Sequence, residues 1–199
     1  MQGILLAAGF GRRFQEGVGS EQDKLLALLP QPGDTRQTVL WQSANALITA
    51  LPNSMAVIQP QQIERKKILQ DLGFVIIEST NAAHGMGYAI SDAVRASPNV
   101  CGWLVALADM PWVTAELIKI ISERITDQHS IVAPSFNGKR GQPVAFGAAW
   151  FEQLNALRGD TGARELLQTS VIDWVDWHDD SIHRDVDSQQ DLSKFKAGS

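Results

Sequence analysis

Residues 4–13 read Ile-Leu-Leu-Ala-Ala-Gly-Phe-Gly-Arg-Arg, an apolar run that leads directly into a glycine loop with two arginines. An apolar run of this length that ends at a glycine is typical of a buried strand. Glycine lets the backbone approach a phosphate and expose its N–H groups, and a helix start adds partial positive charge. The stretch therefore predicts a first strand followed by a candidate phosphate-binding loop.

This glycine loop fits neither of two familiar nucleotide motifs. The dinucleotide fingerprint needs a third glycine where this chain has Phe14, and the Gly-Lys-Ser/Thr sequence of a P-loop is absent. Short glycine patterns carry little specificity by themselves. From the loop alone, a tight turn whose arginines face solvent and a phosphate site with cations from Arg12, Arg13 and Lys24 are equally good interpretations.

Further apolar runs alternate with segments of helical periodicity. The runs lack polar alternation, which is typical of parallel strands covered on both faces of a sheet. Ligands of such sheets bind outside the carboxyl ends of the strands, so the loops after the first, third and fourth strands are candidate sites. We expect strands at residues 4–8, 55–58, 74–77, 103–108, 130–133 and 143–146, and helices at 39–51, 63–72, 87–96 and after Thr114.

The bulk composition excludes several classes of protein. The chain has 199 residues, a formal net charge of −5 and one cysteine, Cys101, so we expect a single domain over residues 1–199 without an intrachain disulfide. There is no signal-peptide pattern and no apolar stretch of about 20 residues, so we expect a cytoplasmic protein with no membrane partner. An acidic chain lacks the basic stripe of nucleic-acid binders, so nucleic acid is not an expected partner.

A candidate metal ligand follows the apolar run at 103–108. Asp109 stands in Ala108-Asp109-Met110-Pro111, at the end of a predicted central strand. Mg²⁺ prefers one or two carboxylates together with substrate phosphates and water. Aspartate is also common in turns. The residues alone leave both interpretations open.

The run Leu6-Ala7-Ala8-Gly9-Phe10-Gly11-Arg12-Arg13-Phe14, with a lysine downstream, resembles the signature of the nucleotidyltransferase superfamily. It is most similar to the molybdenum cofactor cytidylyltransferases, which are related to the molybdopterin guanylyltransferases. The resemblance covers nearly the whole chain and implies an α/β fold with three layers, α/β/α, around a mostly parallel, Rossmann-like sheet. Ala8 is like the cytidylyl branch, because the guanylyl branch usually has glycine there.

The resemblance also implies roles for single residues. Arg12, Lys24 and Asp109 would be catalytic, although the segment before Lys24 is longer than usual and a surface lysine is the alternative there. Residues 183–192 resemble the closing motif of the family, in which Asp187 joins Asp109 as a Mg²⁺ ligand and Asp185 is a backup. Asp187 or Ser188 would also suit as a cap of the last helix. The implied nucleotide-binding residues are Leu6, Ala7, Ala8, Gly9, Gly11, Arg12, Lys24, Ser79, Gly85 and Met86.

Two later stretches resemble parts of the family that flank the acceptor. Residues 138–144 are similar to Gly-x-x-Gly-His/Asn-Pro-Val, with glutamine at the variable position, and residues 158–164 match Gly-Asp-x-Gly-Ala-Arg. A helix cap at Asp160 or Thr161 is the plainer interpretation of the second stretch. The implied acceptor-binding residues are Gln142, Pro143, Asp160 and Arg164.

The expected function is Mg²⁺-dependent transfer of CMP from CTP to a molybdopterin-type molybdenum cofactor, with release of pyrophosphate. The alternatives are nucleotidyl transfer to a sugar or polyol phosphate, GMP transfer to molybdopterin, and a chaperone that binds the cofactor without turnover. The expected partners are the nucleoside triphosphate, the phosphorylated acceptor and a recipient molybdoenzyme or its chaperone.

Overall fold

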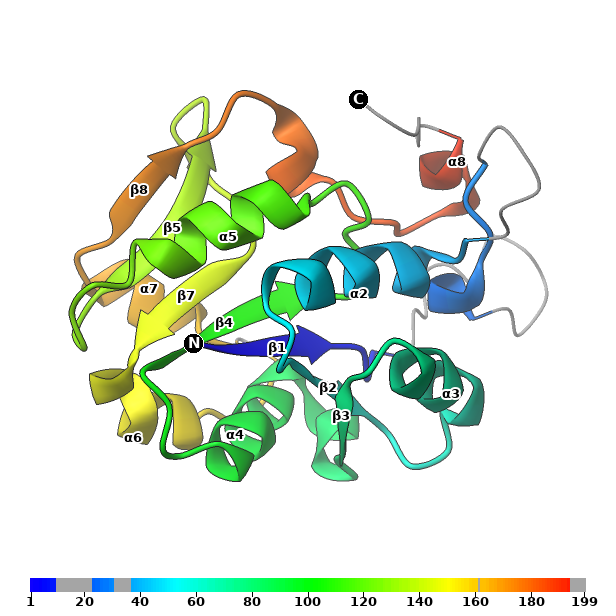
Figure 1. The fold of residues 1–199 in the computed structure, drawn as a ribbon, viewed down its shortest axis with the longest axis horizontal. Helices are drawn as coiled ribbons and strands as arrows, with labels where there is room; N and C mark the ends of the chain where they lie inside the picture. Colours follow the sequence, from blue (N-terminus) through cyan, green and yellow to red (C-terminus); the bar gives the residue numbers. More distant parts are fainter. Residues whose placement is uncertain (10–22, 31–36, 161, 194–199) are drawn as a thin grey trace.

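The computed structural model describes residues 1–9, 23–30, 37–160 and 162–193, and its centre is an eight-stranded sheet (Figure 1). The strands run in the order β3-β2-β1-β4-β7-β5-β6, and β8 pairs with β5. Their bounds are β1 (Gln2–Leu6), β2 (Met55–Ile58), β3 (Val75–Glu78), β4 (Gly102–Leu107), β5 (Ile131–Phe136), β6 (Lys139–Arg140), β7 (Val144–Gly147) and β8 (Asp173–Asp176).

The sheet is mostly parallel, as the unbroken apolar runs predict. β1 lies parallel to both β2 and β4, and β2 lies parallel to β3. β7 is antiparallel to β4 and to β5. Only a short connection through β6 separates β5 from β7, whereas a parallel crossover needs a dozen or more residues, so the chain can return only in the antiparallel direction.

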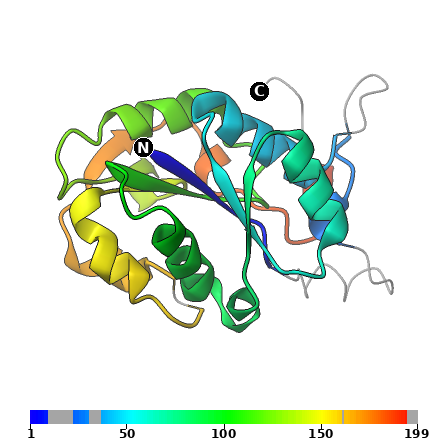
Figure 2. The same ribbon diagram turned by 60° about the horizontal axis from the view of Figure 1, so that its bottom comes forward.

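Helices cover both faces of the sheet and give the expected three layers (Figures 1 and 2). Alternate side chains along β1 enter opposite cores: Leu5 packs in one and Ile4 in the other. The core that contains Leu5 is closed by α2 (Val39–Ala50), α3 (Ile63–Asp71) and α5 (Ala115–Glu123). The core that contains Ile4 is closed by α4 (Met86–Ala96), α6 (Phe151–Asn155) and α7 (Arg164–Thr169).

Local signals set several helix ends. Thr114 caps α5, because its side chain accepts a hydrogen bond from the Leu117 N–H. Ser188 forms a capping box with Asp191 at the start of α8 (Gln189–Leu192), in agreement with the expected cap. The predicted cap at Asp160 is wrong, because α7 begins after Ala163, which makes no side-chain cap bond.

No helix in the described parts of the chain is long and apolar enough to cross a membrane.

Candidate active site

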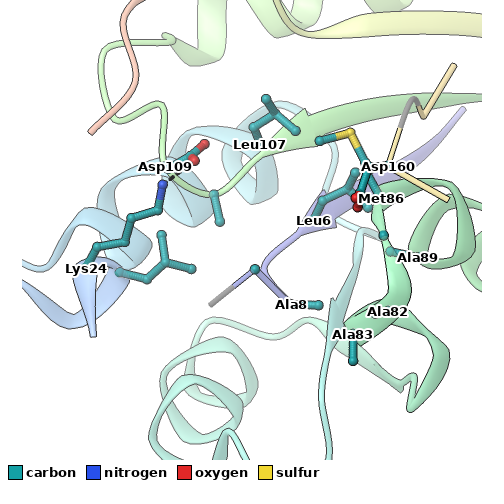
Figure 3. Close-up of a pocket in the computed structure, with 14 residues that line it drawn as sticks. Leu6, Ala8, Lys24, Ala82, Ala83, Met86, Ala89, Leu107, Asp109 and Asp160 are labelled. Carbon is teal, nitrogen blue, oxygen red and sulfur yellow. Dashed lines mark hydrogen bonds and ion pairs between the residues drawn. The ribbon is translucent and has the colours of Figure 1, made fainter. Parts of the chain in front are cut away.

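A cavity of about 390 Å³ opens beyond the carboxyl ends of β1 and β4 (Figure 3). Lys24 and Asp109 stand at one end of it, and Leu6, Met86 and Asp160 gather at the other. Its remaining lining residues are small or apolar: Ala8, Gly9, Leu25, Ala82, Ala83, Gly85, Ala89, Leu107 and Ala108. The cavity therefore has a charged end and an apolar end that carries one carboxylate.

Lys24 anchors the charged end. It begins the short 3-10 helix η1 (Lys24–Leu26), and its Nζ lies 2.8 Å from Asp109 Oδ2 and 3.3 Å from Asp187 Oδ1. Burial by itself would lower the pKa of the Lys24 ammonium, but the two carboxylates outweigh burial and raise that pKa. Since the side chain is only 10% exposed, the alternative of a surface lysine is wrong.

Three carboxylates meet beside Lys24. Oxygens of Asp109, Asp185 and Asp187 lie within 4.8 Å of one another. Residues 185–187 are held beside the end of β4 because the Val186 N–H donates to the Asp109 carbonyl over 2.8 Å. Val186 is fully buried, so the aspartates on either side of it project together from the opposite side.

This group of oxygens suits a hard divalent cation. Burial raises the pKa of Asp185, and the charges of Asp187 and Asp109 raise it further. Like charges at this distance repel unless a cation lies among them, and carboxylate oxygens are the ligands that Mg²⁺ and Ca²⁺ take. The donor set therefore fits a divalent metal, with Asp185 joining the two aspartates predicted from the sequence.

The start of the glycine loop is fixed through its carbonyl groups. The guanidinium of Arg65 donates to the carbonyls of Ala7 and Gly9, and Gln59 Nε2 donates to the Ala8 carbonyl over 2.7 Å. The C=O and N–H of a trans peptide point in opposite directions. The N–H groups of Ala8 and Gly9 therefore face away from Arg65 and Gln59, and both residues line the cavity.

Arg65 positions residues of the candidate site and was not predicted from the sequence. It lies on α3, only 2% exposed, and forms two 2.7 Å bonds to the carboxylate of Asp23. Asp23 in turn caps η1, so Arg65 ties the glycine loop to the turn that carries Lys24. The available signal was weak: Arg65 stands four residues before the buried Leu69, which places both on the inner face of α3.

The loop after β3 forms the apolar end. Gly85 has a φ of +132°, and a Cβ there would lie 2.3 Å from the Gly159 backbone and 2.6 Å from an oxygen of Asp160. Glycine is therefore required for residues 159–160 to pack against the start of α4. Met86 lines the cavity beside them.

The structure does not bring every predicted residue to this cavity. Ser79 is buried, donates to Asp92 over 2.5 Å and accepts from the Ala82 N–H, so it supports the loop from behind. Gln142 and Arg164 line a neighbouring cavity, and Pro143 lies in a small pocket beside Gln142. Asp160, expected with that acceptor set, lines the first cavity instead. Gly11, Arg12 and Arg13 lie outside the described residues.

A family described as MobA-like NTP transferase domain matches residues 3–177. The purine catabolism protein PucB of Bacillus subtilis is 29% identical over 94 residues, which are 46% of this chain and 45% of that protein. The chain thus matches less than half the length of this curated relative.

Solved structures share the fold at low sequence identity. A nucleotidyl transferase from Methanothermobacter thermautotroptrophicus has a TM-score of 0.80 at 18% identity, with 97% of this chain and 94% of that chain covered. The protein Rv0371c of Mycobacterium tuberculosis, solved in complex with manganese, has a TM-score of 0.71 at 21% identity, with 97% and 96% covered.

Proposed function

The chain belongs to the family of MobA-like NTP transferase domains, and from this premise we propose that it transfers CMP from CTP to a molybdopterin-type molybdenum cofactor and releases pyrophosphate. The observation that carries the proposal is the cavity with two unlike ends: Lys24 and Asp109 line one end, with Asp185 and Asp187 beside Asp109, and apolar side chains line the other end. A nucleoside triphosphate has the same division between a polyanionic end and a flat, largely apolar base.

The charged end suits the triphosphate. Lys24 supplies a positive charge that its raised pKa preserves well above neutral pH, and the N–H groups of Ala8 and Gly9 supply neutral donors. Gly11 and Arg12 follow Gly9 closely in the sequence, and in the proposal they would add further phosphate contacts. Asp109 and Asp187, with Asp185, would hold Mg²⁺, and the fact that the mycobacterial protein was solved in complex with manganese supports a divalent cation as part of the proposal.

The proposed chemistry needs no protein nucleophile. An oxygen of the acceptor phosphate attacks the α-phosphorus in line, a new P–O bond forms, and the bond from the α-phosphorus to the bridging oxygen of the β-phosphate breaks. The acceptor phosphate is already ionised near neutral pH, so no general base is required. Lys24 and Arg12 would stabilise the charge that develops on the departing pyrophosphate. A bound divalent cation would neutralise charge on the phosphate oxygens.

Asp160 supports a choice among bases. Its carboxylate at the apolar end can accept a hydrogen bond from an exocyclic amino group, such as N4 of cytosine, whereas uracil offers an acceptor there. Guanine also offers amino and imino donors, so GMP transfer is the second candidate. Ala8, which resembles the cytidylyl branch, favours CTP between the two.

The proposed acceptor side rests on Gln142 and Arg164, which line a cavity that also contains Met86, and on Pro143, which lies in a small pocket beside Gln142. We propose that the molybdopterin-type acceptor binds there. In this proposal residues 1–199 form a single domain that works in the cytoplasm. The product would pass to a recipient molybdoenzyme or its chaperone. Sugar and polyol phosphates are the alternative acceptors, and a non-catalytic cofactor chaperone is the alternative from another class.

The decisive experiment measures pyrophosphate. The protein is incubated with Mg²⁺ and each of the four ribonucleoside triphosphates, with and without molybdenum cofactor. We expect release that depends on CTP, Mg²⁺ and the cofactor together. Release with GTP, or with a sugar phosphate in place of the cofactor, would transfer the assignment to that alternative. Tight cofactor binding without any release would favour the chaperone.

A further inference from the structure

A second cavity, of about 80 Å³, adjoins the first and shares Met86 and Leu107 with it. Two arginines from distant parts of the chain line it: Arg140 from β6 and Arg164 from the start of α7. Gln142 lines the same cavity, and the other lining residues are apolar. Arg140 also lines a pocket of about 280 Å³ that extends to Asp185, at the edge of the carboxylate group.

The charges of the two arginines are not compensated within the described residues. Burial lowers the pKa of Arg140, and the nearby charge of Arg164 lowers it further. No carboxylate of the described residues forms an ion pair with either of them, whereas four other arginines each pair with an aspartate: Arg65, Arg95, Arg124 and Arg184. Two adjacent guanidinium groups in one cavity are unfavourable unless an anion joins them.

We propose that Arg140 and Arg164, with the amide of Gln142, bind the dianionic phosphate group of the acceptor. The inference rests on the proposed function and adds to it a further binding residue, Arg140, and the group of the acceptor that this cavity would hold, a phosphomonoester. The planar fork of each guanidinium matches two phosphate oxygens, and a pair of forks matches a dianion better than it matches a carboxylate.

The position of the pair explains why the acceptor, and not the nucleotide, would use it. Met86 and Leu107 lie between this cavity and the one that contains Lys24. From Arg140, the adjoining pocket leads past Gln142 to Asp185. A phosphate held here would therefore adjoin the cavity proposed for the nucleotide, with a pocket that connects it to the carboxylate group.

Binding of inorganic phosphate tests the site without any turnover. Isothermal titration of the wild type is compared with Arg140→Gln, Arg164→Gln and the surface control Arg124→Gln. We expect the dissociation constant to rise about 10-fold or more in each of the first two variants, as for the loss of a charged hydrogen bond, and to stay constant in the control. Lys24→Met separates this site from the triphosphate end and should keep the wild-type affinity.

The unfolding temperature measured without phosphate distinguishes an anion site from a structural role of Arg140. If Arg140 only stabilised the fold, its substitution would lower the unfolding temperature. Arg140→Gln should unfold at a higher temperature than the wild type, because the substitution removes a repulsion. A lower unfolding temperature together with wild-type phosphate affinity would overturn the proposal. Phosphate binding that Lys24→Met abolishes and the two arginine variants keep would also overturn it.

Kinetics then link the site to the reaction. With turnover, the KM for the acceptor should rise at least about 10-fold in both variants while the KM for the nucleotide stays constant. An unchanged acceptor KM would exclude a role for the pair in acceptor binding. If no nucleotide is turned over, the proposed function fails, and the phosphate titration still decides whether the anion site exists.

Discussion

Asp109 acts through two parts of one residue. Its carbonyl accepts from the Val186 N–H and so positions Asp185 and Asp187, while its carboxylate contacts Lys24. A substitution of the side chain leaves the backbone contact available. The effects of such a variant can therefore be assigned to the lost carboxylate.

We expect Asp109→Ala to lower Mg²⁺-dependent pyrophosphate release by about 100-fold or more, the cost of losing a group that stabilises transition-state charge. The measurement is steady-state pyrophosphate release at saturating nucleotide. Asp173→Ala is the control, because Asp173 is an exposed carboxylate paired with Arg124, remote from the cavity. Near-normal turnover of Asp109→Ala would remove this residue from the metal site.

Asp160→Asn tests base selection. The amide retains the shape of the side chain but offers both a donor and an acceptor, so it no longer discriminates against uracil. We expect the ratio of kcat/KM for CTP over UTP to fall about 10- to 100-fold, which corresponds to about 1–3 kcal/mol for one base contact. Asp71→Asn, on the far end of α3, is the control. A constant ratio would place Asp160 outside the base contacts.

At the scale of elements, the segment from the end of β2 into α3 fixes the glycine loop. Gln59 and Arg65 together bind the carbonyls of three successive residues, 7–9. Arg65 also binds Asp23 through a paired, nearly buried ion contact. Residues 7–9, at the start of the glycine loop, therefore owe their direction partly to a helix that does not line the cavity.

Arg65→Met should destabilise the protein by about 3 kcal/mol, because it removes the charged hydrogen bonds to Asp23 and leaves the carbonyls of Ala7 and Gly9 without their donor. Urea unfolding measures this free energy. The neighbouring pair of Lys66 and Glu78 is partly exposed, so Lys66→Met should cost only about 0–1 kcal/mol. Arg65→Lys retains the positive charge but loses the planar guanidinium. This variant should fold, and its affinity for CTP should be lower than that of the wild type. Wild-type CTP affinity in both Arg65 variants would show that the loop holds its shape unaided.

The elements themselves were largely predictable, since unbroken apolar runs such as 103–106 lie in buried strands and Thr114 caps α5 as its sequence indicates. The antiparallel direction of β7 could not be predicted, because a hydrophobic pattern does not show in which direction a strand runs relative to its neighbours. Arg65 was missed because its partners, Asp23 and three backbone carbonyls, are distant in sequence. Asp160 was predicted to bind the acceptor because it belongs to the same sequence motif as Arg164. A sequence motif does not show which cavity each of its residues lines, and Asp160 lines the first cavity.

For the molecule as a whole, the sheet brings together groups that lie far apart in the chain. Lys24 contacts Asp109 across 85 residues and Asp187 across 163. In this arrangement Lys24 neutralises part of the negative charge of the carboxylates that would otherwise attract a metal ion. A divalent cation must compete with Lys24, and a triphosphate that attracts Lys24 would release the carboxylates to the metal. Nucleotide and metal affinities should therefore be coupled, and equally in both directions.

We expect CTP to raise the affinity for Mn²⁺ by about 5- to 150-fold, the usual range of such coupling. The decisive variant is Lys24→Met, measured without nucleotide by electron paramagnetic resonance of free Mn²⁺. It should bind Mn²⁺ about 10-fold or more tightly than the wild type, because a competing unit charge a few ångströms away contributes several kcal/mol even at an effective dielectric constant of about 20. Lys66→Met should not change the affinity, since Lys66 pairs with Glu78 and does not contact the carboxylates. Weaker Mn²⁺ binding by Lys24→Met would mean that the lysine assists the metal instead of competing with it, and equal binding would mean that it does neither. Either result would contradict the proposed coupling between nucleotide and metal.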